Sequence, residues 1–233
     1  MTLRSIPMAG GTTFTLASFE ASRVSRLLAT VPLERLRLRR MPGLAWARHL
    51  GTSAGGRTLG ADLTRWAWFC SWDDEAAAAA FHEALAARLE PREVATLHLR
   101  AVRARGRWAG HEVPVAEGAP EPATASPLVV LTRARVRARQ WRPFTGSVPP
   151  VDATLARAPG LLRSVGVGEW PVLVQGTMSL WRDGAAMAAF ARSDAHRVVV
   201  RRTAQEGWYA EELFARFSVE RAEGTWDGSP PLP

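Results

Sequence analysis

Alternating apolar and polar residues mark the strands that we expect along this chain, and alanine-rich stretches mark two of its helices. In the first 110 residues this pattern predicts strands over 13–19, 44–50, 63–72 and 95–103, and helices over 22–39 and from Asp73 or Asp74 to Leu89. An aspartate before the alanine-rich helix is a favourable N-cap, because its carboxylate accepts a hydrogen bond from a free backbone N–H of the first turn. The order strand, helix, strand, strand, helix, strand is that of a ferredoxin-like unit.

The remaining residues predict the same order a second time. Strands are expected over 128–136, 161–167, 172–181 and 212–220, with a Pro-rich stretch leading into a helix over 152–158 and helical residues over 183–205. A break in the last helical stretch is expected at Ser193 and Asp194. Two such four-stranded sheets can pack face to face or close into a barrel, with their helices outside.

Sequence identity between the halves supports a tandem duplication. Residues 72–81 align with 181–190, and seven of these ten positions are identical. The pattern Ala-x-Gly-x-Trp-x-Gly at 104–110 recurs at 222–228, and Pro-Gly-Leu at 42–44 recurs at 159–161. Between the copies, residues 111–127 contain four prolines and cannot sustain a helix or a central strand.

We therefore expect an α+β fold in which two ferredoxin-like halves are fused into a dimeric α/β-barrel arrangement within one chain. Residues 1–110 form the first half, which serves mainly as a scaffold, and residues 111–127 form the linker. Residues 128–233 form the second half, where a chemical site is expected.

Composition and charge change this picture little. The 233 residues carry a formal net charge of +8, and all 30 basic residues are arginine. Arginines that alternate with apolar residues, as at 35–39 and 133–139, are typical of a solvated face, with a nucleic-acid or acidic-lipid surface as the alternative. The lone Cys70 excludes an intramolecular disulfide and is expected in the core. Without a signal-peptide core or an apolar run of about 18 residues, we expect the chain in the cytoplasm.

Several common catalytic motifs are missing from the sequence. No C-x-x-C, H-E-x-x-H or G-x-S-x-G pattern occurs, and the glycine-rich segment 51–60 lacks the Lys-Ser/Thr of a phosphate loop. Among the five histidines, His196 shares a helical face with Val199, Val200 and Thr203, which directs its side chain inward. A buried histidine is more often a core residue with one hydrogen bond than a ligand, so spacing alone leaves both interpretations open.

The repeat also allows the two halves to be compared position by position. The informative aligned pairs are Trp66 with Gln175, Trp68 with Thr177, and Ala87 with His196. Large indole side chains in the first half are thus replaced by smaller polar side chains in the second, which leaves more space there.

Glycines and arginines of the second half are further candidates. Gly166, Gly168 and Gly176 indicate close approach of a ligand or of backbone, or a bulge. Arg133 and Arg197 are expected within reach of the same region and could pair with the carboxylates of an anionic cofactor, although such arginines more often face water.

Four stretches of the second half are distinctive: Gly-Val-Gly-Glu-Trp-Pro-Val-Leu at 166–173, residues 181–190, Glu-Gly-Trp-Tyr-Ala-Glu-Glu-Leu-Phe-Ala-Arg-Phe at 206–217, and Gly-Thr-Trp at 224–226. Together they resemble the spheroidene monooxygenase family of bacterial carotenoid oxygenases. The run at 206–217 is the most specific. The resemblance also covers Leu-Thr-Arg-Ala at 131–134 and Arg-Gly-Arg-Trp at 105–108, and it is weakest around 45–62.

The resemblance implies a haem enzyme that uses O2 to oxidise an unactivated carbon of a long apolar polyene to an alcohol or, after a second round and dehydration, a ketone. It extends to tandem ferredoxin-like haem proteins whose iron ligand is a histidine on the last long helix of the second half. His196 fits that position, so haem b with its iron on His196 is expected. Further cofactor contacts are expected from Gly176, Met178, Arg197, Val200 and Phe217, and catalytic contributions from Arg133, Gln175 and Thr177.

The implied partners are a carotenoid-like substrate, O2 and an electron-donating reductase or ferredoxin, with transient membrane-surface contact through the Arg-rich face. A monomer and a homodimer both fit. One alternative is a cofactor-independent oxygenase, or other haem chemistry such as oxime dehydration or N-oxidation. A second is a basic non-enzymatic module for anionic lipid or nucleic acid, against which the missing RNA-binding aromatic motif argues.

Overall fold

A computed structural model describes residues 11–53, 60–115, 125–169 and 174–233. The first half comprises β1 (Thr12–Ser18), the short 3-10 helix η1 (Ala21–Arg23), α1 (Val24–Arg39), β2 (Leu44–Ser53), β3 (Ala61–Trp72), α2 (Glu75–Leu89) and β4 (Glu93–Gly106). The second half comprises β5 (Leu128–Val136), η3 (Ala138–Gln140), α3 (Trp141–Ala156), β6 (Leu161–Gly168), β7 (Val174–Trp181), α4 (Gly184–Ala191), α5 (Asp194–Glu206) and β8 (Tyr209–Gly224). The predicted order of elements is confirmed in both halves.

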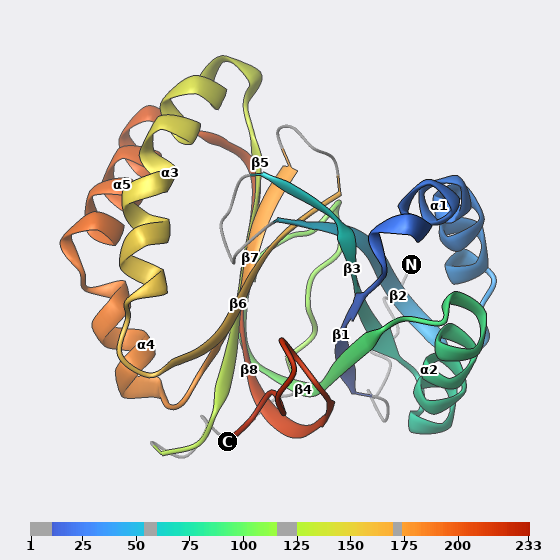
Figure 1. Cartoon of the computed structure of the whole chain (residues 1–233). Coiled ribbons are helices and arrows are strands. Elements are labelled where there is room, and N and C mark those ends of the chain that lie inside the picture. The colour runs from blue at the N-terminus through green and yellow to red at the C-terminus, as the bar shows by residue number, and fades with distance from the viewer. Residues whose placement is uncertain (1–10, 54–59, 116–124, 170–173) are drawn as a thin grey trace, which may run out of the picture.

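The eight strands close into one antiparallel barrel in the order β1-β3-β2-β6-β7-β5-β8-β4. The halves meet at two seams: β4 and β8 pair at eleven positions, whereas β2 and β6 pair at two, Gly51 with Gly168 and Thr52 with Val167. Of the two arrangements expected, the closed barrel is therefore the one formed. Figure 1 shows α1 and α2 outside the barrel on one side and α3, α4 and α5 on the other.

The barrel interior is an apolar core to which both halves contribute. Phe14 and Phe69 of the first half belong to the same buried cluster as Met178 and Phe217 of the second. The rings of Phe69 and Phe217 meet edge to face with centroids 5.8 Å apart. Because burial of such a side chain stabilises the fold by about 1.5–3 kcal/mol, this shared core holds the halves together.

In the first half, large aromatic and apolar side chains fill most of the layer between the sheet and its helices. One continuous cluster contains Trp66, Trp68, Cys70 and Trp72 of β3 together with buried residues of α1 and α2. Cys70 is a buried free thiol whose pKa is raised by burial, so its predicted core position is confirmed. α2 begins where expected, since Asp74 Oδ1 accepts a hydrogen bond from the Ala77 backbone N–H at 2.7 Å.

The largest difference from the sequence prediction concerns α3. It spans sixteen residues from Trp141 and continues through Pro149 and Pro150, where only a helix over 152–158 was expected. Each proline removes one backbone donor, but Phe144, Val148 and Leu155 are buried by the helix, and their burial outweighs that loss.

The other boundaries agree closely with expectation. The predicted break in the last helix is confirmed by the separation of α4 and α5. The predicted β7 residues 172 and 173, and most of the linker, lie outside the described residues. No helix in the described ranges is long and apolar enough to cross a bilayer.

Candidate functional site beneath the last helices

The layer between sheet and helices is built differently in the second half. Two separate small clusters replace the continuous one, Leu128, Leu155, Trp181, Ala186 and Met187 at one end and Val136, Phe144, Val148 and Trp208 at the other. Between them, the helix-facing side chains of the sheet are only half-buried. These are Val130, Thr132, Gln175, Thr177, Phe214 and Arg216.

The α5 helix has the same character. It contains no buried residue, whereas α2 in the first half buries four. The register explains the contrast: Thr177 pairs with Thr132 in the second half where Trp68 pairs with Thr15 in the first, and Trp68 is fully buried. Small polar residues therefore occupy positions that indole rings fill in the other copy.

His196 lies in the first turns of α5 and is half-buried. Its ring is 5.2 Å from that of Phe190, and its Nδ1 lies 3.1 Å from the backbone oxygen of Ala191. That carbonyl is available because α4 ends at Ala191 and α5 begins only at Asp194. With Nδ1–H donating to it, the Nε2 lone pair has no partner in the described part of the chain.

Electrostatics favour the neutral form of this imidazole. Burial lowers the pKa of His196 below its ordinary value, and the hydrogen bond to Ala191 opposes that shift only in part. A neutral imidazole with one nitrogen fixed by a carbonyl and the other unpaired is the arrangement found in metal-ligating histidines.

The sequence-predicted residues divide between the two faces of the second sheet. Gln175 and Thr177 lie on the helix-facing side with His196, while Met178 and Phe217 belong to the barrel core on the opposite side. Gly176 also serves the sheet itself: a Cβ there would come within 2.6 Å of the Thr132 backbone oxygen, so its absence allows β5 to approach.

Two further predicted contacts on α5 are accessible to solvent. Arg197 is exposed, and the Val200 side chain is 53% exposed. Four residues that the sequence interpretation did not include face the helices, namely Val130, Thr132, Phe214 and Arg216. Strand alternation within 129–133 and 213–217 contains the signal that would have selected them.

Two surface pockets of about 440 Å³ each lie on the first half, away from His196. One is on α1 and the other lies between α1 and β2, with Trp46, Arg48 and Glu169 among its lining residues. Neither coincides with the half-buried layer. Among the described residues, no three His, Cys, Asp or Glu side chains converge on a metal-binding position.

Comparison with known proteins identifies the family. No family model matches the chain. A curated spheroidene monooxygenase from Rubrivivax gelatinosus is 38% identical over 192 residues, which are 80% of this chain and 73% of that protein. The chain belongs to the spheroidene monooxygenase family.

Two other spheroidene monooxygenases are similar. The protein from Rhodobacter capsulatus is 38% identical over 146 residues, and the chain spans only 61% of its length. The protein from Cereibacter sphaeroides is 28% identical over 235 residues, covering 94% of this chain and 70% of that protein.

The fold of this spheroidene monooxygenase family member is shared with solved structures. An aldoxime dehydratase superposes with a TM-score of 0.59 at 12% identity, covering 93% of this chain and 83% of the other. A second aldoxime dehydratase, solved in complex with butyraldoxime, has the same TM-score at 11% identity, covering 94% of this chain and 86% of that one. At these identities the likeness establishes the barrel fold alone.

Residues from three of the stretches that carry the resemblance to spheroidene monooxygenases meet on the barrel side of β5. Arg133, whose side chain is 4% exposed, donates to Glu169 Oε2 at 2.9 Å and to Glu211. Glu211 also accepts from the backbone N–H groups of Ala109 and Gly110, at 2.9 and 3.2 Å. Arg133 is thus held by two carboxylates on the barrel side of β5, and the structure does not bring it to His196.

Proposed function

We propose that this chain is a haem-dependent monooxygenase that oxidises a spheroidene-like carotenoid. The observation that carries the proposal is the half-buried layer opposite His196, at positions that tryptophans fill in the first half. The names of the curated relatives supply the reaction class and the substrate. The environment of His196 supports the cofactor.

The residues present fit a haem. His196 offers a neutral nitrogen whose orientation is set by the Ala191 carbonyl, and one such nitrogen is what a haem iron needs from the protein. The other ligands that the iron needs would be the nitrogen atoms of the porphyrin itself, so the protein would have to provide no multi-residue donor set. When bound, haem supplies the activation of O2 for attack on a C–H bond.

The protein's own contribution is then to bind and orient the polyene and to exclude water. Val130 and Phe214 offer apolar contacts, and an apolar substrate gains affinity from their desolvation. Thr132 and Thr177 place hydroxyl groups on the same face, where they can hydrogen-bond a newly formed alcohol. Each hydroxylation consumes one O2, two electrons and two protons and releases water, so an external reductase or ferredoxin must supply the electrons.

Hemin reconstitution tests the proposal directly. The purified chain is expected to bind hemin with a Soret band that shifts on reduction and CO addition, and to oxidise the carotenoid only when reconstituted. Thr177→Trp installs the first-half residue at the equivalent position. It is expected to keep the fold and to weaken hemin binding about tenfold to a hundredfold, because overpacking costs about 1–3 kcal/mol.

The control is Thr225→Trp, at an exposed position of the C-terminal turn. A spectrum indifferent to hemin, or equal affinity in both tryptophan variants, contradicts the proposal. Carotenoid turnover without hemin would instead identify a cofactor-independent oxygenase.

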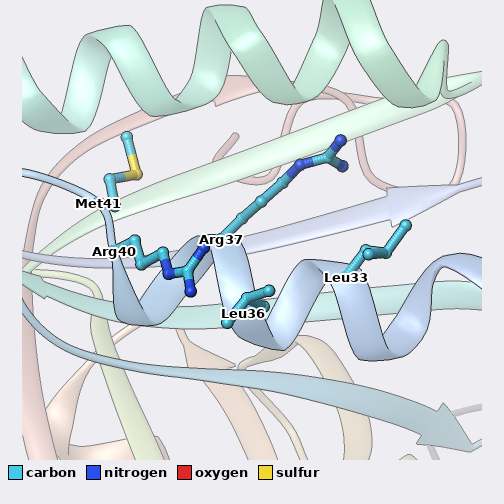
Figure 2. A pocket seen from close by; sticks show the side chains of 5 residues that line it. All are labelled: Leu33, Leu36, Arg37, Arg40 and Met41. Atoms are coloured by element: carbon cyan, nitrogen blue, oxygen red, sulfur yellow. The ribbon is translucent and has the colours of Figure 1, made fainter.

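We also propose that α1 contacts an anionic membrane surface, from which an apolar polyene must come. Figure 2 shows Leu33, Leu36, Arg37, Arg40 and Met41 lining the pocket on this helix. Leu33 and Leu36 are 53% and 41% exposed, and the neighbouring guanidinium groups complement acidic headgroups.

Co-sedimentation with lipid vesicles checks this contact. We expect binding to vesicles of phosphatidylcholine mixed with phosphatidylglycerol, little binding to phosphatidylcholine alone, and loss of binding in Leu33→Ser/Leu36→Ser. The matched control, Leu63→Ser/Val198→Ser, removes two exposed apolar side chains elsewhere and should bind like the unmodified chain. Equal sedimentation of all three proteins would rule out α1 as the contact.

A further inference from the structure

Arg216 differs from every other shielded arginine in the described residues. Eight arginines are buried or half-buried, and seven of them have a hydrogen bond or an ion pair. The seven are Arg23, Arg48, Arg65, Arg88, Arg133, Arg163 and Arg202. Arg216 has neither among the described residues. Because removing a charge from water is costly unless it is paired, such a guanidinium is suited to bind an anion from outside the chain.

The position of Arg216 relates it to the candidate site. On β8, Ala215 and Phe217 belong to the barrel core, so Arg216 between them faces the helices. Its cross-strand neighbours are the exposed Arg103 on β4 and Val130 on β5, and Val130 packs against the same cluster as Phe190. Because the Phe190 ring also contacts His196, Arg216 and His196 lie at the same end of the half-buried layer.

The carboxylates nearest to Arg216 along β8 already have partners. Glu212 pairs with Arg105 of the neighbouring strand β4, and Glu220 pairs with Arg100, which also lies on β4. The equivalent position in the first half is His98, which has Glu223 within 3.6 Å. At this repeat position, therefore, only the second-half side chain lacks a charged partner among the described residues.

We propose that Arg216 binds a carboxylate of the molecule that occupies this layer. If the proposed haem function holds, on which this inference rests, that group is a haem propionate. A guanidinium offers two parallel N–H donors to a carboxylate, and such charge-assisted pairs are among the strongest hydrogen bonds in proteins. Arg216 would hold a propionate of the haem, and His196 would hold its iron.

Hemin and hemin dimethyl ester separate the carboxylate contact from all other contacts. The unmodified chain is expected to bind hemin at least about tenfold more tightly than the ester, since a hydrogen bond to a charged group contributes about 1.5–3 kcal/mol. Arg216→Gln should bind both porphyrins with similar affinity, close to that of the unmodified chain for the ester. Arg216→Lys should retain part of the preference, because it keeps the charge but loses the bidentate geometry.

The matched control is Arg201→Gln, an exposed arginine on α5 without a partner in the described residues. It should keep the full preference for hemin, and thermal melting of each apoprotein establishes that all variants fold. If Arg216→Gln still prefers hemin while binding it through His196, the inference is overturned and the proposed function stands. If the unmodified chain binds neither porphyrin, both are overturned.

Discussion

Replacing His196 by alanine is expected to leave a folded protein that no longer ligates hemin. The ring is half-buried, with a single hydrogen bond to the Ala191 carbonyl, so its removal should cost only about 0.5–1.5 kcal/mol of stability. The other four histidines, His49, His82, His98 and His111, all precede the second half, so no other imidazole of the second half can replace its Nε2. The Soret band of the mixture should therefore remain that of unligated hemin.

Rescue and a matched histidine distinguish ligation from loss of structure. His196→Gly leaves a space that free imidazole can enter, and added imidazole should restore the ligated spectrum. His82→Ala is the control: His82 is also half-buried on a helix with one side-chain hydrogen bond, to Thr15 at 3.0 Å, but in the filled first half. A ligated spectrum in His196→Ala, or its loss in His82→Ala, would show that iron is bound elsewhere.

The sequence predicted the order of the elements because local patterns determine it. Strand alternation and an aspartate cap are properties of neighbouring residues, and Asp74 caps α2 as expected; Asp183 caps α4 in the same way at the aligned position. The start of α3 was missed because two prolines obscured an apolar face that becomes stable only when it packs on the sheet.

The partners of a side chain depend on which face of its strand it occupies, so a prediction of those partners must first assign the face. Arg133 and Thr132 are adjacent, yet one pairs with Glu169 inside the barrel and the other faces the helices. Alternation alone would have separated them. The partners Glu169 and Glu211 could not be inferred, since barrel closure brings them to Arg133 from 36 and 78 residues away.

The duplicated fold therefore has two kinds of interior, the core of the barrel and the layers between the sheet and the helices. The barrel is shared and buries an ionic network, and its stability depends on both halves. Each layer between sheet and helices is built from residues of one half only. The layer of the second half can therefore remain partly open while tryptophans fill that of the first. A site in the second layer can change without disturbing the closure of the barrel.

Replacing Arg133 by leucine is expected to destabilise the fold by about 3–5 kcal/mol, because Glu211 loses its ion pair and stays close to Glu169, which keeps only Arg48 as its partner. Denaturant unfolding at neutral pH measures this loss. The control is Arg100→Leu, which removes a guanidinium that is 60% exposed and pairs with Glu220; surface pairs contribute about 0–1 kcal/mol. An equal decrease in the free energy of unfolding of the two variants would mean that burial does not increase the contribution of the Arg133 ion pairs to stability.

The pH dependence provides a second signature of the same network. Burial acts to raise the pKa of Glu211, but hydrogen bonds from Ala109, Arg133 and Gly110 outweigh it, and the pKa lies below its ordinary value of 4.5. The stability contributed by this carboxylate is therefore fully present above pH 4.5 and is lost as pH falls through the lowered pKa. The difference in unfolding free energy between the unmodified chain and Arg133→Leu should shrink below pH 4.5.

Since Arg133 lies on the barrel side of β5, refolded Arg133→Leu should still bind hemin with an unchanged spectrum. A changed spectrum would place Arg133 in contact with the cofactor.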